Sequence, residues 1–239
     1  MPLVLGVTGS IATGKSLLCQ HLVERYAVVH ADADKVVHRM YDPGKPAFDR
    51  IVAEFSREIV GPDGAIDRKI LGSKVFGNRE RMGALTKAIG DISGEMQRVI
   101  DEWRATLPRE TVAILEAVNL MEAGYSAWCD ATWLVAAEDE TALPRLMQRN
   151  GFSEGEARQR LASARHWQDR AGGADHVFHN DGTLEDFLAE AGRVLDETKR
   201  AFLAGTLPPS QYEGWRVEYE QQMEAQRAGR EAAQARSDG

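Results

Sequence analysis

The chain has 239 residues, of which 43% are hydrophobic, and its formal net charge is -8 at pH 7. An acidic balance of this size disfavours broad electrostatic binding to nucleic acid or to anionic membranes. No apolar run in the sequence reaches the roughly 18 residues that a membrane-spanning helix needs. We therefore expect a cytoplasmic protein with one large domain, no nucleic-acid or membrane partner, and a monomeric or weakly homo-oligomeric state.

The two cysteines, Cys19 and Cys129, are too few for a disulfide framework and are expected to be reduced thiols. Cys19 falls in a predicted helix, where a buried structural thiol is the expected role. The six histidines do not follow the spacing of a metal-binding motif, so the sequence predicts no metal site built on histidine.

The first predicted elements are a strand at residues 3–7 and a helix at residues 17–26. Between them, residues 9–16 match the pattern G-x-x-x-x-G-K-[ST]. Glycines let the backbone fold around an anion with its N–H groups pointing inward, and the following helix presents its positive end. Because the match lies between a strand and a helix, we predict a loop that holds the phosphates of a nucleoside triphosphate.

The residue types in this loop have distinct expected roles. Lys15 would reach the β and γ phosphates, and the Ser16 hydroxyl would hold Mg²⁺. Thr8, just before the loop, is expected on the acceptor side. The residues expected to contact the nucleotide are Gly9, Ser10, Ile11, Ala12, Thr13, Gly14, Lys15, Ser16 and Leu17.

The second predicted strand covers residues 27–30, and the stretch HADAD at residues 30–34 follows it. Asp32 and Asp34 would lie at the carboxyl end of that strand, the edge where open parallel sheets bind ligands. One carboxylate could accept the proton of an acceptor hydroxyl, and the other could support Mg²⁺ through water. A solvated turn or helix cap is the structural alternative.

A stripe of apolar residues from Met82 to Trp103 follows alternating spacings of three and four and predicts a core-facing helix that ends near Pro108. Gly90 and Gly94 lie inside the stripe and allow a kink or a break, because glycine costs about 1 kcal/mol against alanine in a helix. A groove for a long substrate beside this helix is the alternative interpretation.

Three further apolar runs, at residues 111–115, 132–136 and 176–179, predict the remaining strands. Strands that alternate with helices favour a parallel sheet covered on both faces. The predicted fold is α/β, with a five-stranded parallel sheet flanked by helices, a helical substrate-binding region at about residues 60–108 and a helical lid at about residues 140–170.

The predicted lid contains two helices. The first covers residues 141–148 and ends at Asn150-Gly151, and a capping box of Ser153 with Glu156 starts the second. Arg145 and Arg149 are four residues apart and share one helix face, where a closing lid could bring them to the phosphates. Solvated surface arginines are the alternative.

A proline pair at residues 208–209 separates the predicted main domain, residues 1–206, from a tail at residues 207–239. The tail is polar and rich in helix formers, with a thin apolar stripe that runs from Tyr212 through Trp215 to Met223. We expect a helix that packs back on the domain or on a partner and frays at its end.

Several classes of protein use such a phosphate loop. GTPases need an N-K-x-D element, which the sequence lacks. Motor and transporter ATPases place an acidic residue at the end of a long apolar strand, and the run VAILE, which ends at Glu116, is only a loose match. A small-molecule kinase fits a chain of this length best.

Several stretches together resemble the dephospho-CoA kinase family, over most of residues 3–195. The phosphate loop is generic, but the order and spacing of the other stretches are specific to that family. The stretches are GVTGSIATGKS, DADKVVHRMYDPGKPAF, GAIDRKILGSKVFGN, RLMQRNGFSEGEARQRLAS and ADHVFHNDGTLEDF.

The resemblance implies transfer of the γ-phosphate of ATP to the ribose 3′-hydroxyl of dephospho-CoA, the last step of CoA synthesis. It implies that Asp34 is the general base and that Lys15 and Arg145 clamp the transferring phosphate. It also implies that Ser16 binds Mg²⁺ and that Asn180 lies near the adenine of ATP. ATP and Mg²⁺ are thus the expected cofactors, and dephospho-CoA is the expected partner.

The chain departs from the family pattern at four places. A His-Pro pair is replaced by Gly90-Asp91, and a Pro-Leu-Leu element by residues 118–120, Val-Asn-Leu. The lid has Arg165 where a glutamine is usual, and an asparagine that is often doubled is followed here by Asp181. Because these changes gather where the acceptor should bind, they bear on the identity of the acceptor more than on the phosphoryl-transfer reaction.

Three hypotheses therefore stay open at the level of the sequence. The first is an active dephospho-CoA kinase. The second is a P-loop kinase for another acceptor, such as a nucleoside, a nucleotide or another adenylated compound. The third is a nucleotide-binding partner protein without useful catalysis, whose Trp215-bearing tail docks elsewhere.

Overall fold

The computed structural model describes residues 1–237, with side chains described through residue 229. The chain forms two compact units. The first consists of Met1–His30 and Trp103–Gly239, and the second of Ala31–Glu102. None of the helices within the described residues is both long and apolar enough to cross a membrane.

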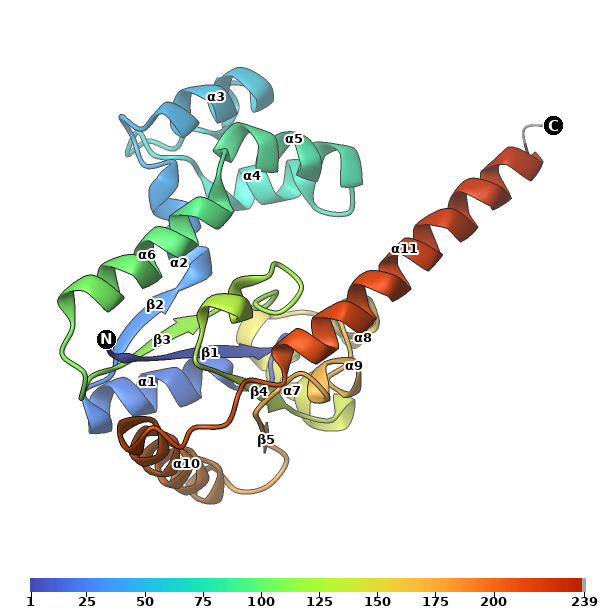
Figure 1. Ribbon diagram of the computed structural model, residues 1–239. Coiled ribbons are helices and arrows are strands. Elements are labelled where there is room, and N and C mark those ends of the chain that lie inside the picture. The colour runs from blue at the N-terminus through green and yellow to red at the C-terminus, as the bar shows by residue number, and fades with distance from the viewer. Residues whose placement is uncertain (238–239) are drawn as a thin grey trace. The chain divides into compact units, whose positions relative to one another are not determined.

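The first unit is built around a five-stranded sheet (Figure 1). Its strand order is β2-β3-β1-β4-β5, and β1 pairs in parallel with β3 and β4, as β4 does with β5. The prediction of a five-stranded parallel sheet flanked by helices is confirmed. The strands are β1 (Leu3–Gly9), β2 (Val29–Asp32), β3 (Val112–Glu116), β4 (Ala131–Ala136) and β5 (His176–His179).

The side chains of β1 alternate between the two faces of the sheet, as the period of a strand requires. Leu3, Leu5 and Val7 belong to a core that also contains residues of α1 (Lys15–Tyr26) and α10 (Leu184–Ala204). On the opposite face, a Cβ at Gly6 would come within 2.5 Å of Leu120, so the chain after β3 crosses close over the sheet there. Both faces of β1 are therefore covered, which explains why its sequence is a continuous apolar run.

The predicted lid helices are present as α7 (Asp139–Asn150) and α8 (Glu154–Ser163). Gly151 takes a left-handed conformation between them, with φ of 68°, and Ser153 and Glu156 form the predicted capping box. The two helices pack through small and apolar side chains, and the short α9 (Gln168–Ala171) follows.

The second unit is helical. It contains α2 (Ala33–Met40), α3 (Pro46–Phe55), the 3₁₀ turn η1 (Arg57–Ile59), α4 (Arg68–Val75) and α5 (Arg79–Ile89). It ends within the helix α6 (Ile92–Thr106), whose residues through Glu102 belong to this unit. Its core is built on Ile51, Phe55, Ile59, Leu71 and Ile89.

The apolar stripe from Met82 to Trp103 is split between two helices and not carried by one. The chain breaks at Gly90, which has φ of 102°, and Asp91 then accepts a hydrogen bond from the backbone N–H of Gly94 over 2.8 Å. The break that Gly90 allowed is therefore real, because only glycine adopts this conformation without strain.

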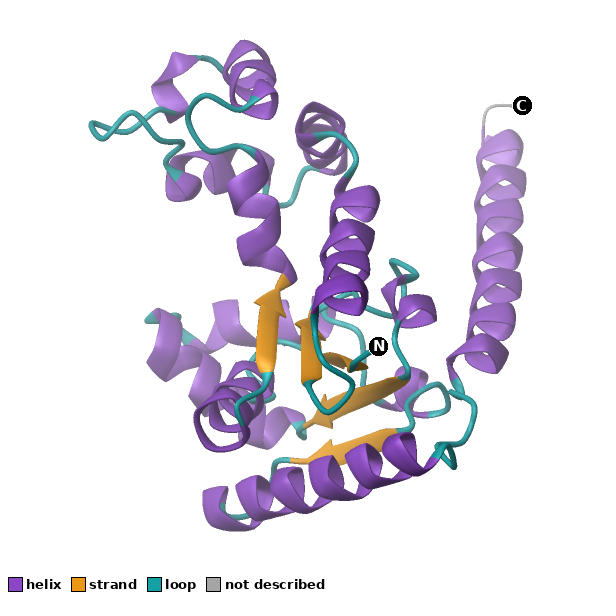
Figure 2. Ribbon diagram, turned by 60° about the vertical axis from the view of Figure 1, so that its left-hand side comes forward, coloured by secondary structure: helices purple, strands orange, loops and turns teal. Residues whose placement is uncertain are grey.

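The tail forms α11 (Tyr212–Ser237), which extends beyond the elements it packs on in the first unit (Figures 1 and 2). Its first turns bury Tyr212 and Trp215 against Met121. The Tyr212 hydroxyl donates to the carbonyl oxygen of Met121 over 2.9 Å, and Trp215 Nε1 donates to that of Asp169 over 2.7 Å. Packing of the tail on the domain is thus confirmed for its first turns.

We predict that Trp215→Ala lowers the free energy of unfolding by about 3 kcal/mol, since it removes a large buried ring and leaves a cavity. Urea denaturation followed by circular dichroism would measure the change. Val217→Ala, on the same helix but 56% exposed, is the matched control and should shift stability by less than about 0.5 kcal/mol. Equal midpoints for the two variants would show that α11 does not stabilise the domain.

Candidate active site

The phosphate loop joins β1 to α1 with a backbone that two glycines make possible. Gly14 precedes α1 in a left-handed conformation, with φ of 101°, and a Cβ there would lie 2.3 Å from Asn180 Nδ2. A Cβ at Gly9 would lie 2.4 Å from the carbonyl oxygen of Val135. Larger residues at either position would therefore push the loop away from the sheet.

Side chains from the loop and from the end of β5 hold this shape. Thr13 Oγ1 donates to the carbonyl oxygen of Ser10 over 3.1 Å, and Asn180 Nδ2 donates to that of Thr13 over 2.9 Å. Asn180 is only 4% exposed. The loop is thus fixed before any ligand arrives, with the N-terminal end of α1 behind it, which is the arrangement that binds phosphate groups.

The lysine of the loop lies against the loop itself. Lys15 is 8% exposed, and its Nζ lies 3.4 Å from the carbonyl oxygen of Ser10. A mostly buried ammonium beside an anion-binding backbone is a strong electrostatic attraction for a phosphate, because solvent screens it little.

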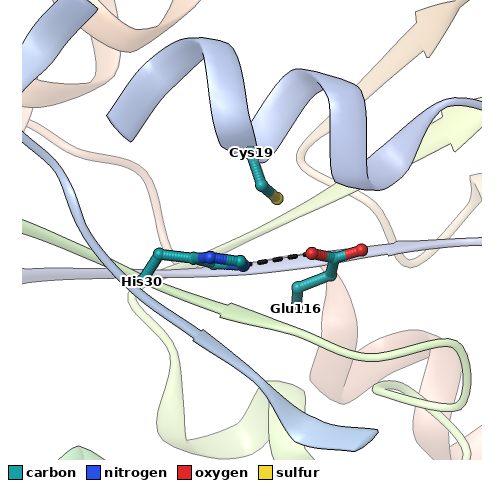
Figure 3. A group of neighbouring side chains, drawn as sticks. All are labelled: Cys19, His30 and Glu116. Carbon is teal, nitrogen blue, oxygen red and sulfur yellow. Dashed lines mark hydrogen bonds and ion pairs between the residues drawn. The ribbon is translucent and has the colours of Figure 1, made fainter. Parts of the chain in front are cut away.

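Ser16 and the end of β3 are joined by a carboxylate. Ser16 Oγ donates to Glu116 Oε1 over 2.7 Å, and His30 Nε2 lies 3.0 Å from Glu116 Oε2 (Figure 3). Burial alone would raise the pKa of Glu116. The hydrogen bonds from His30 and Ser16, together with the charge of Lys15, outweigh burial and lower that pKa, so the carboxylate is ionised at neutral pH.

Glu116 is more closely tied to the loop than the loose match of its strand indicated. The available signal was an acidic residue at the end of a buried apolar strand, in the run VAILE. In the structure this carboxylate lies directly on the hydroxyl of Ser16, which makes the pair a candidate magnesium site of oxygen ligands.

The two arginines predicted to share a lid helix face differ in their contacts, and only Arg145 approaches the residue that holds the loop. Arg145 Nη2 lies 3.5 Å from Asn180 Oδ1, and its Nη1 is buried with no hydrogen-bond partner among the described residues. Arg149 is exposed, and its Nε donates to the side chain of Asn150 over 3.0 Å. A buried, unsatisfied guanidinium nitrogen has a strong preference for an anionic ligand, so Arg145 is the better candidate for a phosphate contact.

A cavity of about 220 Å³ lies between the loop and the chain that follows α8. Ser10 and Thr13 line it on the loop side, and Arg165 and Trp167 on the other. The Ser10 hydroxyl donates to the carbonyl oxygen of Arg165, which ties the two walls together. The cavity places polar groups of both walls beside the phosphate loop.

The two aspartates of HADAD belong to the second unit. Asp32 caps α2, where its carboxylate accepts hydrogen bonds from the backbone N–H groups of Asp34 and Lys35 over 2.9 Å and 3.3 Å. Asp34 is an exposed residue in the first turn of the same helix. The cap interpretation is therefore correct for Asp32, whereas Asp34 is an exposed residue of the helix that Asp32 caps.

Thr8, expected on the acceptor side, and Leu17, expected to contact the nucleotide, differ in solvent exposure. Thr8 is fully buried, and its hydroxyl donates to the carbonyl oxygen of Val118 over 3.0 Å. Leu17 is 41% exposed in the first turn of α1. Thr8 therefore joins the end of β1 to the segment that follows β3.

The departures from the family pattern have structural partners. Arg50 donates to the carbonyl oxygens of Ala88 and Ile89, immediately before Gly90. Arg165 donates to the hydroxyl of Tyr219 in α11 over 3.0 Å. Arg50 thus holds the backbone just before Gly90, and Arg165 is tied to α11.

A parallel sheet whose first strand leads into a glycine-shaped loop, a buried lysine and a helix is the arrangement of a P-loop nucleotide-binding protein. The sequence model of the dephospho-CoA kinase family matches residues 3–186. The chain belongs to the dephospho-CoA kinase family.

Individual relatives agree with this assignment. A dephospho-CoA kinase of Geobacter sulfurreducens is 40% identical over 187 residues, which cover 77% of this chain and 92% of that protein. The crystal structure of TT1252 from Thermus thermophilus has a TM-score of 0.65 at 29% identity, over 82% of this chain and 97% of that one. A dephospho-CoA kinase from Campylobacter jejuni has a TM-score of 0.55 at 25% identity, over 81% and 96%.

We predict that Gly14→Ala weakens ATP binding at least about tenfold, because strained backbone of this kind costs roughly 1–3 kcal/mol and the new Cβ would displace Asn180. Isothermal titration with ATP would measure the loss. Gly214→Ala, where a Cβ meets nothing within 4 Å, is the matched control and should bind ATP like the wild type. Unchanged affinity in Gly14→Ala would contradict the role given to this loop shape.

Proposed function

We propose that this kinase transfers the γ-phosphate of ATP to the ribose 3′-hydroxyl of dephospho-CoA and so forms CoA in the last step of its synthesis. The observation that carries the proposal is the intact phosphate loop, with Lys15 buried at its centre, in a chain that matches the family from residue 3 to residue 186. Such a loop supplies the positioning and charge stabilisation on which phosphoryl transfer depends.

The triphosphate is held by the N–H groups of residues 9–16, with Leu17 in the first turn of α1. Lys15 and Arg145 carry the charge that spreads over the γ-phosphate oxygens in the transition state. The unsatisfied guanidinium nitrogen of Arg145 supports its part in this clamp. Arg149 joins from the lid surface, and Asn180 borders the adenine side while it holds the loop through Thr13.

Mg²⁺ is the metal that fits the oxygen donors of Ser16 and Glu116, because it prefers hard ligands and keeps several waters. The Ser16 hydroxyl would bind it directly and Glu116 through water. When bound, Mg²⁺ neutralises charge on the β and γ phosphates. The short Ser16–Glu116 hydrogen bond holds this donor pair together before the ion binds.

Asp34 is the proposed general base. Its carboxylate accepts the proton of the 3′-hydroxyl as the ribose oxygen attacks the γ-phosphorus, and ADP leaves. Asp32 orients the first turn of α2 by capping it, which fixes the backbone at Asp34. Thr8, at the buried end of β1, supports the acceptor side through its contact with residue 118.

Another nucleoside-like acceptor is the second candidate. The observation that favours it is the Gly90-Asp91 turn in place of the family's His-Pro pair, directly after two backbone carbonyls that accept hydrogen bonds from Arg50. The reaction and the roles of Lys15, Ser16 and Asp34 would be the same. The protein is proposed to act in the cytoplasm, as a monomer or weak homo-oligomer, without nucleic acid.

We predict that Asp34→Asn lowers kcat with dephospho-CoA by about 10²–10⁴-fold, the usual contribution of a general base, while the affinity for ATP is unchanged. Steady-state kinetics and ATP titration on the same preparation would measure both. Asp42→Asn, which makes the same change at an exposed site in the same unit, should leave kcat unaltered. A parallel loss of ATP affinity in Asp34→Asn would instead make Asp34 a metal or nucleotide ligand.

A further inference from the structure

Three side chains from three different elements meet beside the phosphate loop. Cys19 comes from α1, His30 from β2 and Glu116 from the end of β3 (Figure 3). Their potential ligand atoms all lie within 4.8 Å of one another, and His30 Nε2 is 3.0 Å from Glu116 Oε2. The Cys19 side chain points from its helix toward the other two in Figure 3.

These separations suit a single small cation. Zinc binds thiolate sulfur at about 2.3 Å and imidazole nitrogen or carboxylate oxygen at about 2.0–2.2 Å, which in a tetrahedron puts donor atoms roughly 3.3–3.8 Å apart. The observed separations, from 3.0 Å between His30 and Glu116 to at most 4.8 Å, bracket this range, so small side-chain movements would bring the three donor atoms around one ion. Sulfur, imidazole and carboxylate donors together favour zinc-like metals over Mg²⁺.

The surroundings also suit a bound ion. Cys19 is fully buried and Glu116 is 5% exposed, whereas the His30 side chain is 21% exposed and leaves an edge open for entry. A thiolate and a carboxylate would neutralise a divalent charge, which offsets repulsion from the nearby ammonium of Lys15. Binding would release the thiol proton and replace the contact between His30 and Glu116.

We propose that Cys19, His30 and Glu116 form an inhibitory site for a thiophilic divalent cation of the zinc type. The ion takes Glu116 Oε2, with a water as its fourth ligand. Ser16 donates to the other oxygen, Oε1, of the same carboxylate, so an ion fixed on Oε2 takes up negative charge of the group that pairs with Ser16 at the phosphate loop and weakens its support of Mg²⁺. Metal binding does not rest on the proposed function, but the inhibition does.

Binding is tested with Co²⁺ as a spectroscopic probe, on tag-free protein without nucleotide. The wild type should bind one equivalent with a near-ultraviolet thiolate-to-cobalt band, and Zn²⁺ should displace it. Cys19→Ala should lose the band, and His30→Gln, which is partly exposed and keeps a hydrogen-bond donor, should weaken binding by at least about 100-fold. Loss of a residue that only hydrogen-bonds a metal ligand costs up to about 100-fold in metal affinity, so loss of a direct ligand should cost at least as much.

Cys129→Ala is the matched control. Burial raises the pKa of the Cys129 thiol to about 12, and its Sγ lies 3.5 Å from the carbonyl oxygen of Tyr125 and belongs to no ligand cluster among the described residues. This variant should keep the cobalt band. Absence of the band in the wild type, or its persistence in Cys19→Ala, would overturn the site.

Inhibition is tested by ADP formation at fixed Mg²⁺ and buffered Zn²⁺. Zinc should slow the wild type and Cys129→Ala, whereas Cys19→Ala should need at least about 100-fold more zinc for the same loss. Equal inhibition of all three proteins would overturn the inhibitory role even if the cobalt band is present. If the proposed acceptor is wrong, the cobalt experiment still decides the metal site.

Discussion

The hydrogen bond from Asn180 to the carbonyl oxygen of Thr13 joins the end of the last strand to the phosphate loop that follows the first. It is buried and formed against the one residue type that leaves room for it, since a Cβ at Gly14 would occupy the place of the amide nitrogen. This contact holds the loop from which the proposed phosphate-binding groups project. Lys15 is held at the loop, and Arg145 reaches the same amide from the lid.

A second constraint comes from the order of the strands. Because β1 lies between β3 and β4, the loop after β1 has Glu116 on one side and the start of α7 on the other. The hydroxyl of Ser16 can therefore share a carboxylate with His30, although the three residues are far apart in the sequence. The same neighbours bring Cys19 to this carboxylate, so one buried acid serves both a proposed magnesium site and a proposed site for softer metals.

Local patterns predicted much of this fold. The glycine-lysine pattern lies between a strand and a helix as expected, and Ser153 and Glu156 form their capping box. Each of the five apolar runs overlaps a strand, although the second strand is Val29–Asp32 and not residues 27–30, because Ala27 ends α1 in a left-handed conformation. Contacts between residues far apart in the chain could not be predicted from the sequence, because they depend on the order of the strands in the sheet. The pairing of Glu116 with Ser16 required β3 to lie beside β1, and the histidine spacing could not reveal that His30 meets Cys19. The attachment of α11 depends on Met121 and Asp169, which no periodicity in the tail identifies.

Phosphorylation of dephospho-CoA by this chain can be measured in one assay. ADP release from ATP and Mg²⁺ would be followed with and without dephospho-CoA, with mass detection of the product and Lys15→Ala as the inactive reference. We expect ADP release that requires dephospho-CoA, a product heavier by one phosphate, and loss of both in the variant. ATP binding without any gain of phosphate by dephospho-CoA would contradict the proposed function.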